Sequence, residues 1–154
     1  MNIIPFERLI LNSDLTETEL ISKLNMYVEP LSFSWHGFRN SSKSYVGKVN
    51  EKEFGIRRIT KGRNSFLPYV HGRIEKKEKG TEIIITMRLH YVVVVVLLWF
   101  LGFLVFGIIK YHEMTPLLFI LLIYFMTMYF FNEECGKTKN DLEVMLQGPI
   151  TPKP

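Results

Sequence analysis

The chain has 154 residues, of which 47% are apolar and 22% are charged, and its formal net charge is +4. This size and composition exclude a large multidomain enzyme and a disordered chain, and the single cysteine, Cys135, excludes a secreted disulfide scaffold. The charge is unevenly distributed: residues 1–90 carry 15 Lys and Arg against 10 Asp and Glu, whereas residues 91–131 carry one of each. The sequence therefore predicts a basic domain of residues 1–90 that is joined to an apolar segment.

The basic domain opens with a predicted strand, Phe6–Leu11, and then a helix start. Thr16 is placed to cap this helix, and Glu19, three residues later, is placed to close a capping box. Apolar residues recur at helical spacing from Leu20 to Val28, and the pattern stops before Pro30. One amphipathic helix is therefore predicted between these points.

After Pro30 the apolar period changes to two, which is typical of strands. Turn-forming residues at 40–42, 50–52, 61–64 and 76–80 separate the alternating runs. The predicted strands lie near residues 33–36, 45–50, 54–57, 66–74 and 83–89. The predicted fold class is α+β, with one helix packed on an antiparallel meander of about five or six strands and a transmembrane helical hairpin after it.

The apolar segment contains the two predicted membrane spans, residues 91–110 and 115–131. Tyr91–Ile109 has nineteen residues without a charge, which as a helix would be about 28 Å long and match the hydrocarbon core of a bilayer. A second apolar run, Leu117–Phe131, follows a short connection in which Thr115 and Pro116 suit a helix start. A helical hairpin is the favoured interpretation, and one tilted span followed by an amphipathic helix is the alternative.

Basic residues flank the predicted hairpin on its domain side. Five of them precede the first span and two follow the second, whereas the connection between the spans holds Lys110 beside Glu113. The positive-inside rule then predicts a multi-pass protein of the cell inner (plasma) membrane with both termini in the cytoplasm. The first ten residues lack the features of a cleavable signal peptide.

Alternation along the predicted strands would gather basic side chains on one face of the sheet. Residues 39–90 carry 13 Lys and Arg against 5 Asp and Glu. The candidate anion- or lipid-facing residues are Lys48, Arg57, Arg58, Arg63, His71, Arg73 and Arg88, and His36 and His90 are possible additions. Two interpretations stay open: a site for a nucleotide or other anionic ligand, since Arg suits phosphate oxygens, or a surface that rests on anionic headgroups of the lipid bilayer.

Several short segments support a resemblance. They are residues 45–58 (YVGKVNEKEFGIRR), residues 63–68 (RNSFLP), Gly72 and Ile74, Gly80 and Thr81, and residues 87–90 (MRLH) directly before the aromatic-rich span. With these motifs, residues 5–131 resemble a group of small bacterial membrane proteins of uncharacterised activity. The resemblance implies that the β-domain and the hairpin occur as one unit, and it implies no chemistry.

Catalytic signatures are absent from the sequence: it contains no nucleophile elbow, zinc-binding helix motif, Cys-x-x-Cys, P-loop or dinucleotide fingerprint. We therefore predict no enzyme activity, with a membrane-bound enzyme as the disfavoured alternative, and no catalytic residues, no metal site and no cofactor. His36 and His71 could meet across strands in a metal or acid/base site, but ordinary surface histidines are favoured. Cys135 is predicted to be inert, with palmitoylation as the alternative.

Residues 132–154 are predicted to form a polar, mobile tail. Within it, LEVMLQGP (142–149) resembles a picornaviral protease recognition site of the kind added to expression vectors, which sets residues after about 140 apart from the fold.

Two functions remain. The first is a membrane-tethered cytoplasmic module that recognises an anionic ligand or partner, as a small signalling or defence effector would. The second is a structural or assembly protein whose hairpin packs with other membrane helices, including those of a homo-oligomer, and whose basic sheet rests on the anionic inner leaflet.

Overall fold

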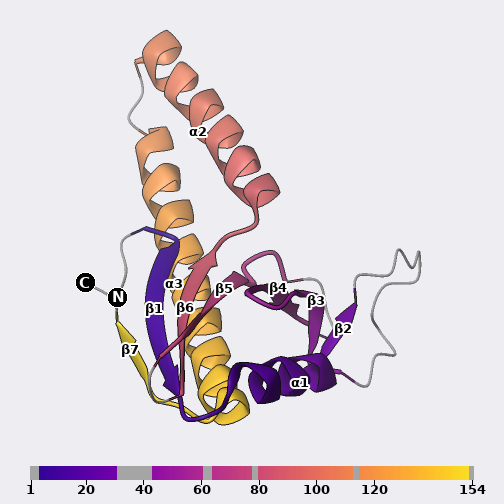
Figure 1. The fold of residues 1–154 in the computed structure, drawn as a ribbon. Coiled ribbons are helices and arrows are strands. Elements are labelled where there is room, and N and C mark those ends of the chain that lie inside the picture. Colours follow the sequence, from indigo (N-terminus) through magenta and orange to yellow (C-terminus); the bar gives the residue numbers. More distant parts are fainter. Residues whose placement is uncertain (1–3, 31–42, 61–63, 78–79, 113–114, 153–154) are drawn as a thin grey trace.

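A computed structural model describes residues 4–30, 43–60, 64–77, 80–112 and 115–152. In these residues the chain forms one seven-stranded sheet and three helices, two of which project from the sheet as a hairpin (Figure 1). In chain order the elements are β1 (Phe6–Ser13), α1 (Glu17–Tyr27), β2 (Val28–Pro30), β3 (Tyr45–Val49), β4 (Glu53–Arg58), β5 (Tyr69–Lys76), β6 (Thr81–Arg88), α2 (Tyr91–Tyr111), α3 (Thr115–Leu146) and β7 (Ile150–Pro152).

The sheet has the strand order β2-β3-β4-β5-β6-β1-β7. The antiparallel meander predicted from the period of two corresponds to β3 through β6, and β1 pairs with β6 along its whole length. Two strands lie outside that prediction: β2 pairs in parallel with β3, and β7 pairs with β1. Both have only three residues, which is too short for an alternating pattern to be recognised. The strand predicted near residues 33–36 lies outside the described residues.

Helix α1 begins as predicted. The backbone N–H of Thr16 donates to Oε2 of Glu19 at 2.9 Å, and the backbone N–H of Glu19 donates to Oγ1 of Thr16 at 3.4 Å. These two reciprocal bonds complete the capping box. The backbone N–H of Thr16 and its hydroxyl both donate to the Glu19 carboxylate, and these two bonds hold the pKa of Glu19 below its usual value because they favour the charged form. Leu20 and Leu24 of the apolar stripe are fully buried, so this face of α1 packs on the sheet.

Helix α2 and the first half of α3 form the projecting hairpin. Both helices are long enough and apolar enough to cross a membrane, and no residue of α2 is buried. The hairpin leaves large apolar side chains in the open, among them Trp99, Phe103 and Phe106, which are 60–73% exposed. The imidazole of His90 caps α2 by accepting a hydrogen bond from the backbone N–H of Val92 at 3.3 Å.

The prediction of a mobile tail after residue 131 is wrong. Helix α3 continues without a break to Leu146 and then packs against the sheet, and β7 extends the sheet beyond β1. The buried residues of α3 include Phe131, Cys135, Thr138, Leu142 and Met145, which recur every three or four positions along one side of the helix. The segment that resembles a protease site is therefore part of the core, because Leu142 and Leu146 are both fully buried.

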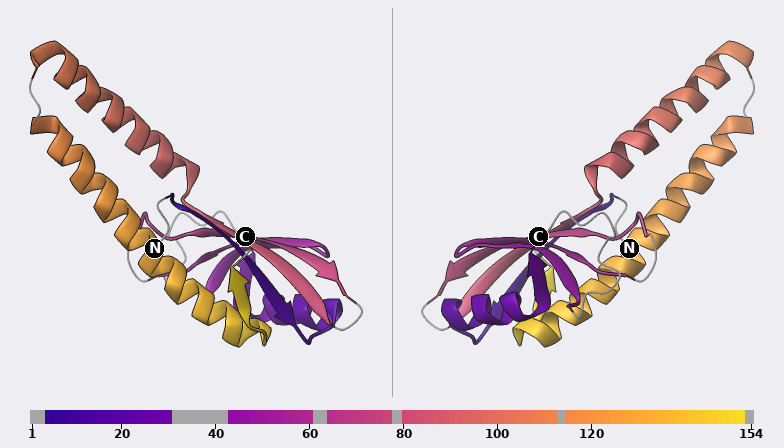
Figure 2. Two further views of the ribbon diagram at one scale, coloured as in Figure 1. Left: turned by 90° about the vertical axis from the view of Figure 1, so that its left-hand side faces the viewer. Right: turned by 90° about the vertical axis from the view of Figure 1, so that its right-hand side faces the viewer.

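The core lies between one face of the sheet and the two helices α1 and α3, which cover that face together (Figure 2). Close packing in this layer depends on Gly72 in β5, where a Cβ atom would lie 2.1 Å from Cζ of Phe54. Among the described residues no helix covers the opposite face, and the hairpin rises on its side of the sheet (Figure 2). We call it the open face. It is formed by alternate positions of β1 and of β3 to β6, which include Arg8, Lys48, Gly55, Tyr69 and Thr86.

Candidate functional site

The open face contains five of the seven predicted candidates. Lys48, Arg57, His71, Arg73 and Arg88 occupy alternate positions of their strands, opposite to the buried positions that pack on the helices. These five side chains therefore share one face of the sheet, and their role toward an anion or lipid stays a prediction. Arg63 lies outside the described residues, as does His36.

Strand register arranges the open face in rows that run across the sheet. The row at the hairpin end joins Arg57, Tyr69, Arg88 and Phe6 as successive Cα partners. The next row joins Lys48, Gly55, His71, Thr86 and Arg8. Two further rows follow, one with Glu53, Arg73 and Ile84 and one with Glu75 and Glu82.

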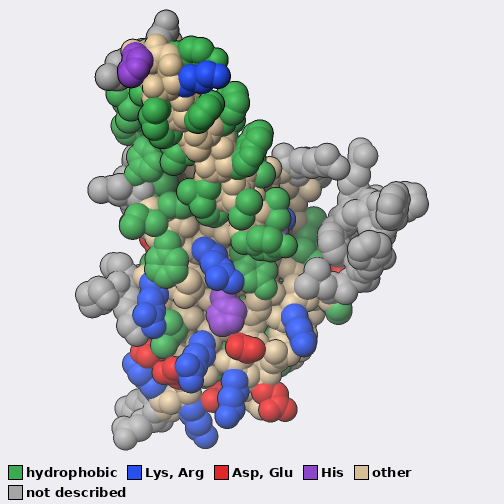
Figure 3. Space-filling view, turned by 90° about the horizontal axis from the view of Figure 1, so that it is seen from above, with side chains coloured by type: hydrophobic (Ala, Val, Ile, Leu, Met, Phe, Trp, Pro, Cys, Tyr) green, Lys and Arg blue, Asp and Glu red, His purple; other side chains and the backbone are tan. Residues whose placement is uncertain are grey.

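These rows separate the charges of the open face. The strand positions of the open face carry five Lys and Arg residues, Arg8, Lys48, Arg57, Arg73 and Arg88. They also carry three Glu residues, Glu53, Glu75 and Glu82. All three Glu residues belong to the two rows far from the hairpin, whereas four of the five cations belong to the two rows nearest to it. Figure 3 shows Lys and Arg side chains adjoining the apolar surface of the hairpin. We call Arg8, Lys48, Arg57 and Arg88 the hairpin-end cations.

Pairing differs between the two ends of the open face. At the far end, Nε of Arg73 lies 3.4 Å from Oε1 of Glu75, and Lys77 pairs with Glu82. Nε2 of His71 lies 3.6 Å from Oε2 of Glu53. Within the part of the chain that the structure describes, none of the hairpin-end cations has an ion pair of this kind. The ion pairs of the open face that involve Lys or Arg therefore lie at its far end.

Two hairpin-end cations are held in place by other contacts. The guanidinium of Arg88 lies over the ring of Tyr69, 6.0 Å from its centroid. Nη2 of Arg57 donates to the backbone carbonyl of Asn64 at 3.2 Å, and burial lowers the pKa of this guanidinium. Asn64 also closes the predicted turn, because its Oδ1 accepts a hydrogen bond from the backbone N–H of Phe66 at 3.0 Å.

Arg58 does not belong to this face, so its prediction as an anion- or lipid-facing residue is wrong. It neighbours Arg57 in β4 and therefore points to the opposite side of the sheet, toward α3. There Nε lies 3.4 Å from Oδ2 of Asp141, and Nη1 lies 3.9 Å from Oε2 of Glu134. Arg58 thus joins the sheet to α3 within residues 132–154, where the sequence predicts a tail.

The contact of Arg58 is part of a polar cluster between the sheet and α3. The hydroxyl of Tyr45 donates to Oδ2 of Asp141 at 3.2 Å, and burial together with that carboxylate raises the pKa of the phenol. Oε1 of Glu134 accepts a hydrogen bond from Nζ of Lys137 at 3.1 Å, but its buried Oε2 has no hydrogen-bond partner in the described residues. Arg58 is therefore the cation that faces this oxygen across the interface.

Cys135 is also buried by α3, at 1% exposure. Burial, with a smaller effect of Glu7, raises the pKa of its thiol to about 12. We expect no detectable labelling of Cys135 by a maleimide at pH 8 in the folded protein and full labelling in denaturant, measured by mass spectrometry. Because the unfolded thiol ionises near pH 9 while the folded thiol stays neutral, this group favours unfolding increasingly above pH 9. Labelling at a similar rate in both states would contradict this expectation.

Among the described residues, no group of three or more His, Cys, Asp or Glu side chains is placed to hold a metal ion. Comparisons of the chain with protein-family models, with curated proteins and with solved structures each found no match.

Proposed function

We propose that the protein is a membrane-tethered binding module that recognises anionic lipid headgroups through the hairpin-end cations. In this proposal α2 and the first half of α3 cross the inner (plasma) membrane, and the sheet with both termini lies in the cytoplasm. The observation that carries the proposal is the charge separation of the open face. Cations without acidic partners lie next to the hairpin, and the Glu residues lie away from it.

The hairpin itself supports membrane insertion. A core helix of a soluble protein buries its apolar side chains, whereas α2 buries none and exposes Trp99 and Phe103. Both helices lead into the same sheet domain at one end of the hairpin (Figure 2). Two spans would therefore leave the whole domain on one side of the membrane, and the basic residues that flank them favour the cytoplasm.

The distance between the open face and the bilayer follows from the chain connection. Arg88 is the last residue of β6, and α2 begins at Tyr91. If Tyr91 lies at the membrane surface, the row of Arg57 and Arg88 lies within reach of the headgroups. Each basic side chain near an anionic leaflet contributes about 1 kcal/mol, so four of them would orient the sheet on the membrane.

The proposal is tested by placing a fluorescent label on each side of the sheet. Thr86→Cys puts the label among the hairpin-end cations, and Ser22→Cys puts it on the exposed side of α1, behind the sheet. In nanodiscs that contain phosphatidylglycerol and a headgroup-attached nitroxide, we expect the Thr86→Cys label to be quenched several-fold more strongly than the Ser22→Cys label. The difference should shrink in phosphatidylcholine and at 1 M salt, where the screening length falls to about 3 Å.

A charge-removal variant provides the matched control. Arg8→Gln, Lys48→Gln and Arg88→Gln together should abolish the preference for phosphatidylglycerol, whereas Arg73→Gln, at an ion pair far from the hairpin, should leave it unchanged. Equal quenching at the two label positions would contradict headgroup binding. A saturable thermal shift with a nucleotide that the triple variant abolishes would instead identify a soluble anion as the ligand.

An assembly role is the second candidate, and the exposure of α2 favours it independently. Trp99 and Phe103 stack on each other at 6.4 Å on the surface of the helix, where another membrane helix could pack. Crosslinking in native membranes tests this role. A homo-oligomer or a stable partner recovered through the hairpin would support it, and a strictly monomeric chain would count against it.

A further inference from the structure

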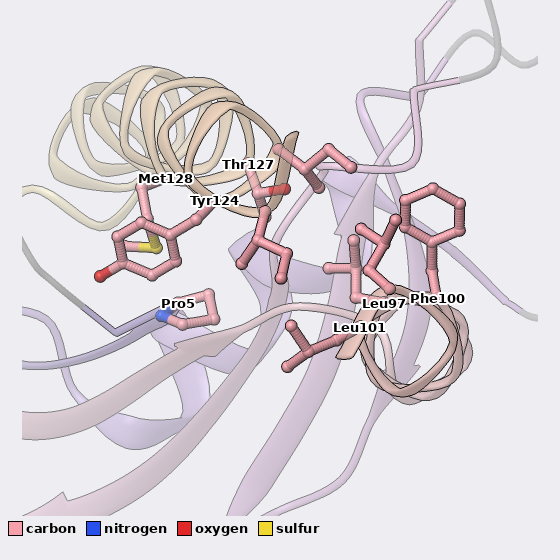
Figure 4. Close-up of a pocket in the computed structure, with 10 residues that line it drawn as sticks. Pro5, Leu97, Phe100, Leu101, Tyr124, Thr127 and Met128 are labelled. Atoms are coloured by element: carbon pink, nitrogen blue, oxygen red, sulfur yellow. The ribbon is translucent and has the colours of Figure 1, made fainter. Parts of the chain in front are cut away.

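The segment that leads into β1, Ile4–Phe6, lies against the hairpin. Pro5 lines the space between α2 and α3, beside apolar or weakly polar residues of both helices: Leu97, Leu101, Thr127 and Met128 (Figure 4). On either side of Pro5, Ile4 is 68% exposed and Phe6 is 48% exposed, although both side chains are large and apolar. The segment therefore contacts the hairpin through Pro5 and presents two apolar residues to its surroundings.

The level at which Pro5 meets α2 lies within the length that this helix needs to cross a bilayer. Tyr91–Tyr111 has 21 residues, which gives a helix of about 31 Å for a hydrocarbon core of about 30 Å. Leu97, beside Pro5, is about 9 Å along the helix from Tyr91. A span that began only at Leu97 would be about 22 Å long and would leave the exposed Val95 in water. If α2 crosses the bilayer, Pro5 therefore lies on the hydrocarbon side of Tyr91.

The backbone of Ile4–Phe6 suits an apolar environment. The N–H of Phe6 donates to the carbonyl of Ile4 at 2.7 Å and closes a three-residue turn. Pro5, at the centre of this turn, has no N–H, and its restricted φ is compatible with the turn. Backbone groups within a bilayer have to be paired inside the protein, because no water is available there. Neither Pro5 nor Phe6 would present an unpaired N–H to lipid.

The charge along β1 changes in the same order as the regions of a leaflet. Residues 3–6 are uncharged. The first charged side chain, that of Glu7, accepts a hydrogen bond from Nζ of Lys139 at 2.5 Å, so it is paired with α3. Arg8, one of the hairpin-end cations, lies about 7 Å from Phe6 along the strand. An apolar tip followed by a basic residue matches acyl chains followed by headgroups.

We propose that Ile4–Phe6 inserts into the inner leaflet beside the hairpin, where Ile4 and Phe6 contact acyl chains below the headgroups. This inference rests on the membrane insertion in the proposed function and adds a third contact with the bilayer, besides the hairpin and the hairpin-end cations. The contact is hydrophobic, so it does not depend on the charge of the lipid. It also sets the height of the sheet, because β1 begins at this tip and carries Arg8 to the headgroups.

Depth-dependent quenching of a small fluorophore tests this contact. The label is attached at Ile4→Cys and, as the matched control, at Asn12→Cys, which is exposed on the same face at the other end of β1. Cys135 is buried, so only the introduced thiol reacts in the folded chain. In nanodiscs of phosphatidylcholine with a doxyl group at carbon 5 of an acyl chain, we expect several-fold stronger quenching at Ile4→Cys than at Asn12→Cys. Iodide in the water should do the reverse.

Phe6→Cys supplies a second position on the same tip. Its label should be quenched by the acyl-chain doxyl group more strongly than the Asn12→Cys label, and neither phosphatidylglycerol nor 1 M salt should change this order. Equal acyl-chain quenching at the tip and at Asn12→Cys would overturn the proposal. So would protection of the Ile4→Cys label from both quenchers, or a disulfide between two Ile4→Cys chains, because protein would then cover this residue.

A label at Leu98→Cys, a position 61% exposed on α2, separates failure of this inference from failure of the proposed function. Acyl-chain quenching at Leu98→Cys but not at Ile4→Cys would leave the hairpin in the membrane and overturn only the insertion of the tip. The absence of quenching at Leu98→Cys would overturn both. Quenching at Ile4→Cys without a difference between Thr86→Cys and Ser22→Cys would support the tip and contradict headgroup binding by the hairpin-end cations.

Discussion

Truncation of the chain after Asn140 is expected to prevent the sheet domain from folding. The deletion removes Leu142 and Leu146, which are fully buried, and Met145, which is nearly so, together with β7. Loss of a large buried side chain costs about 2–5 kcal/mol, and the total stability of a domain is only about 5–15 kcal/mol. Three such losses, with the pairing of β7, therefore consume the stability of the domain.

Point variants measure the same contribution without removing the chain. Leu142→Ala and Leu146→Ala should each lower the free energy of unfolding by about 2–5 kcal/mol. Val144→Ala, in the same turn of α3 but 81% exposed, should change it by less than about 0.5 kcal/mol. Thermal unfolding of the purified full chain in detergent gives the comparison. A truncated chain that unfolds at the same temperature as the full chain would show that residues 141–154 are not part of the domain.

The periodicity of the sequence predicted the sheet better than it predicted what covers the sheet. Alternation placed Lys48, His71 and Arg73 on one face because a strand with one buried side has only two ways to orient its residues. The capping box at Thr16 and Glu19 is equally local and was confirmed. The length and apolar character of Tyr91–Ile109 were sufficient to predict a long helix there.

Two errors, the predicted tail and the assignment of Arg58, share one cause, which is the second half of α3. The polar composition after Phe131 suggested a solvated tail, although Phe131, Cys135, Thr138 and Leu142 recur at intervals of four, three and four residues, which is a helical stripe. That stripe was a usable signal. If residues 132–146 are taken as a tail, no acidic residue is expected near Arg58. The sequence then predicts an anion site for Arg58 together with Arg57. The pairing of β2 and β7 depends on tertiary contacts that local sequence does not encode.

Replacement of Arg58 by Met is expected to lower the free energy of unfolding by about 2–3 kcal/mol. The Met side chain keeps much of the apolar stem but removes the charge that faces Glu134 and Asp141 across the sheet–α3 interface. Breaking a buried ion pair by removing one partner costs about 3–5 kcal/mol, and we reduce this range because the Arg58 side chain is 30% exposed. Oε2 of Glu134 is buried and would lose the cation that faces it.

Arg57→Met is the matched control, because Arg57 is the adjacent residue on the opposite face and donates a single hydrogen bond to the backbone of Asn64. Loss of this hydrogen bond should lower the free energy of unfolding by about 1 kcal/mol. Glu134→Gln removes the buried charge, so adding it to Arg58→Met should restore part of the lost stability, with a coupling of at least about 0.5 kcal/mol in the double-mutant cycle. If Arg58→Met costs no more than Arg57→Met and shows no coupling to Glu134, the interface does not depend on the Arg58 charge.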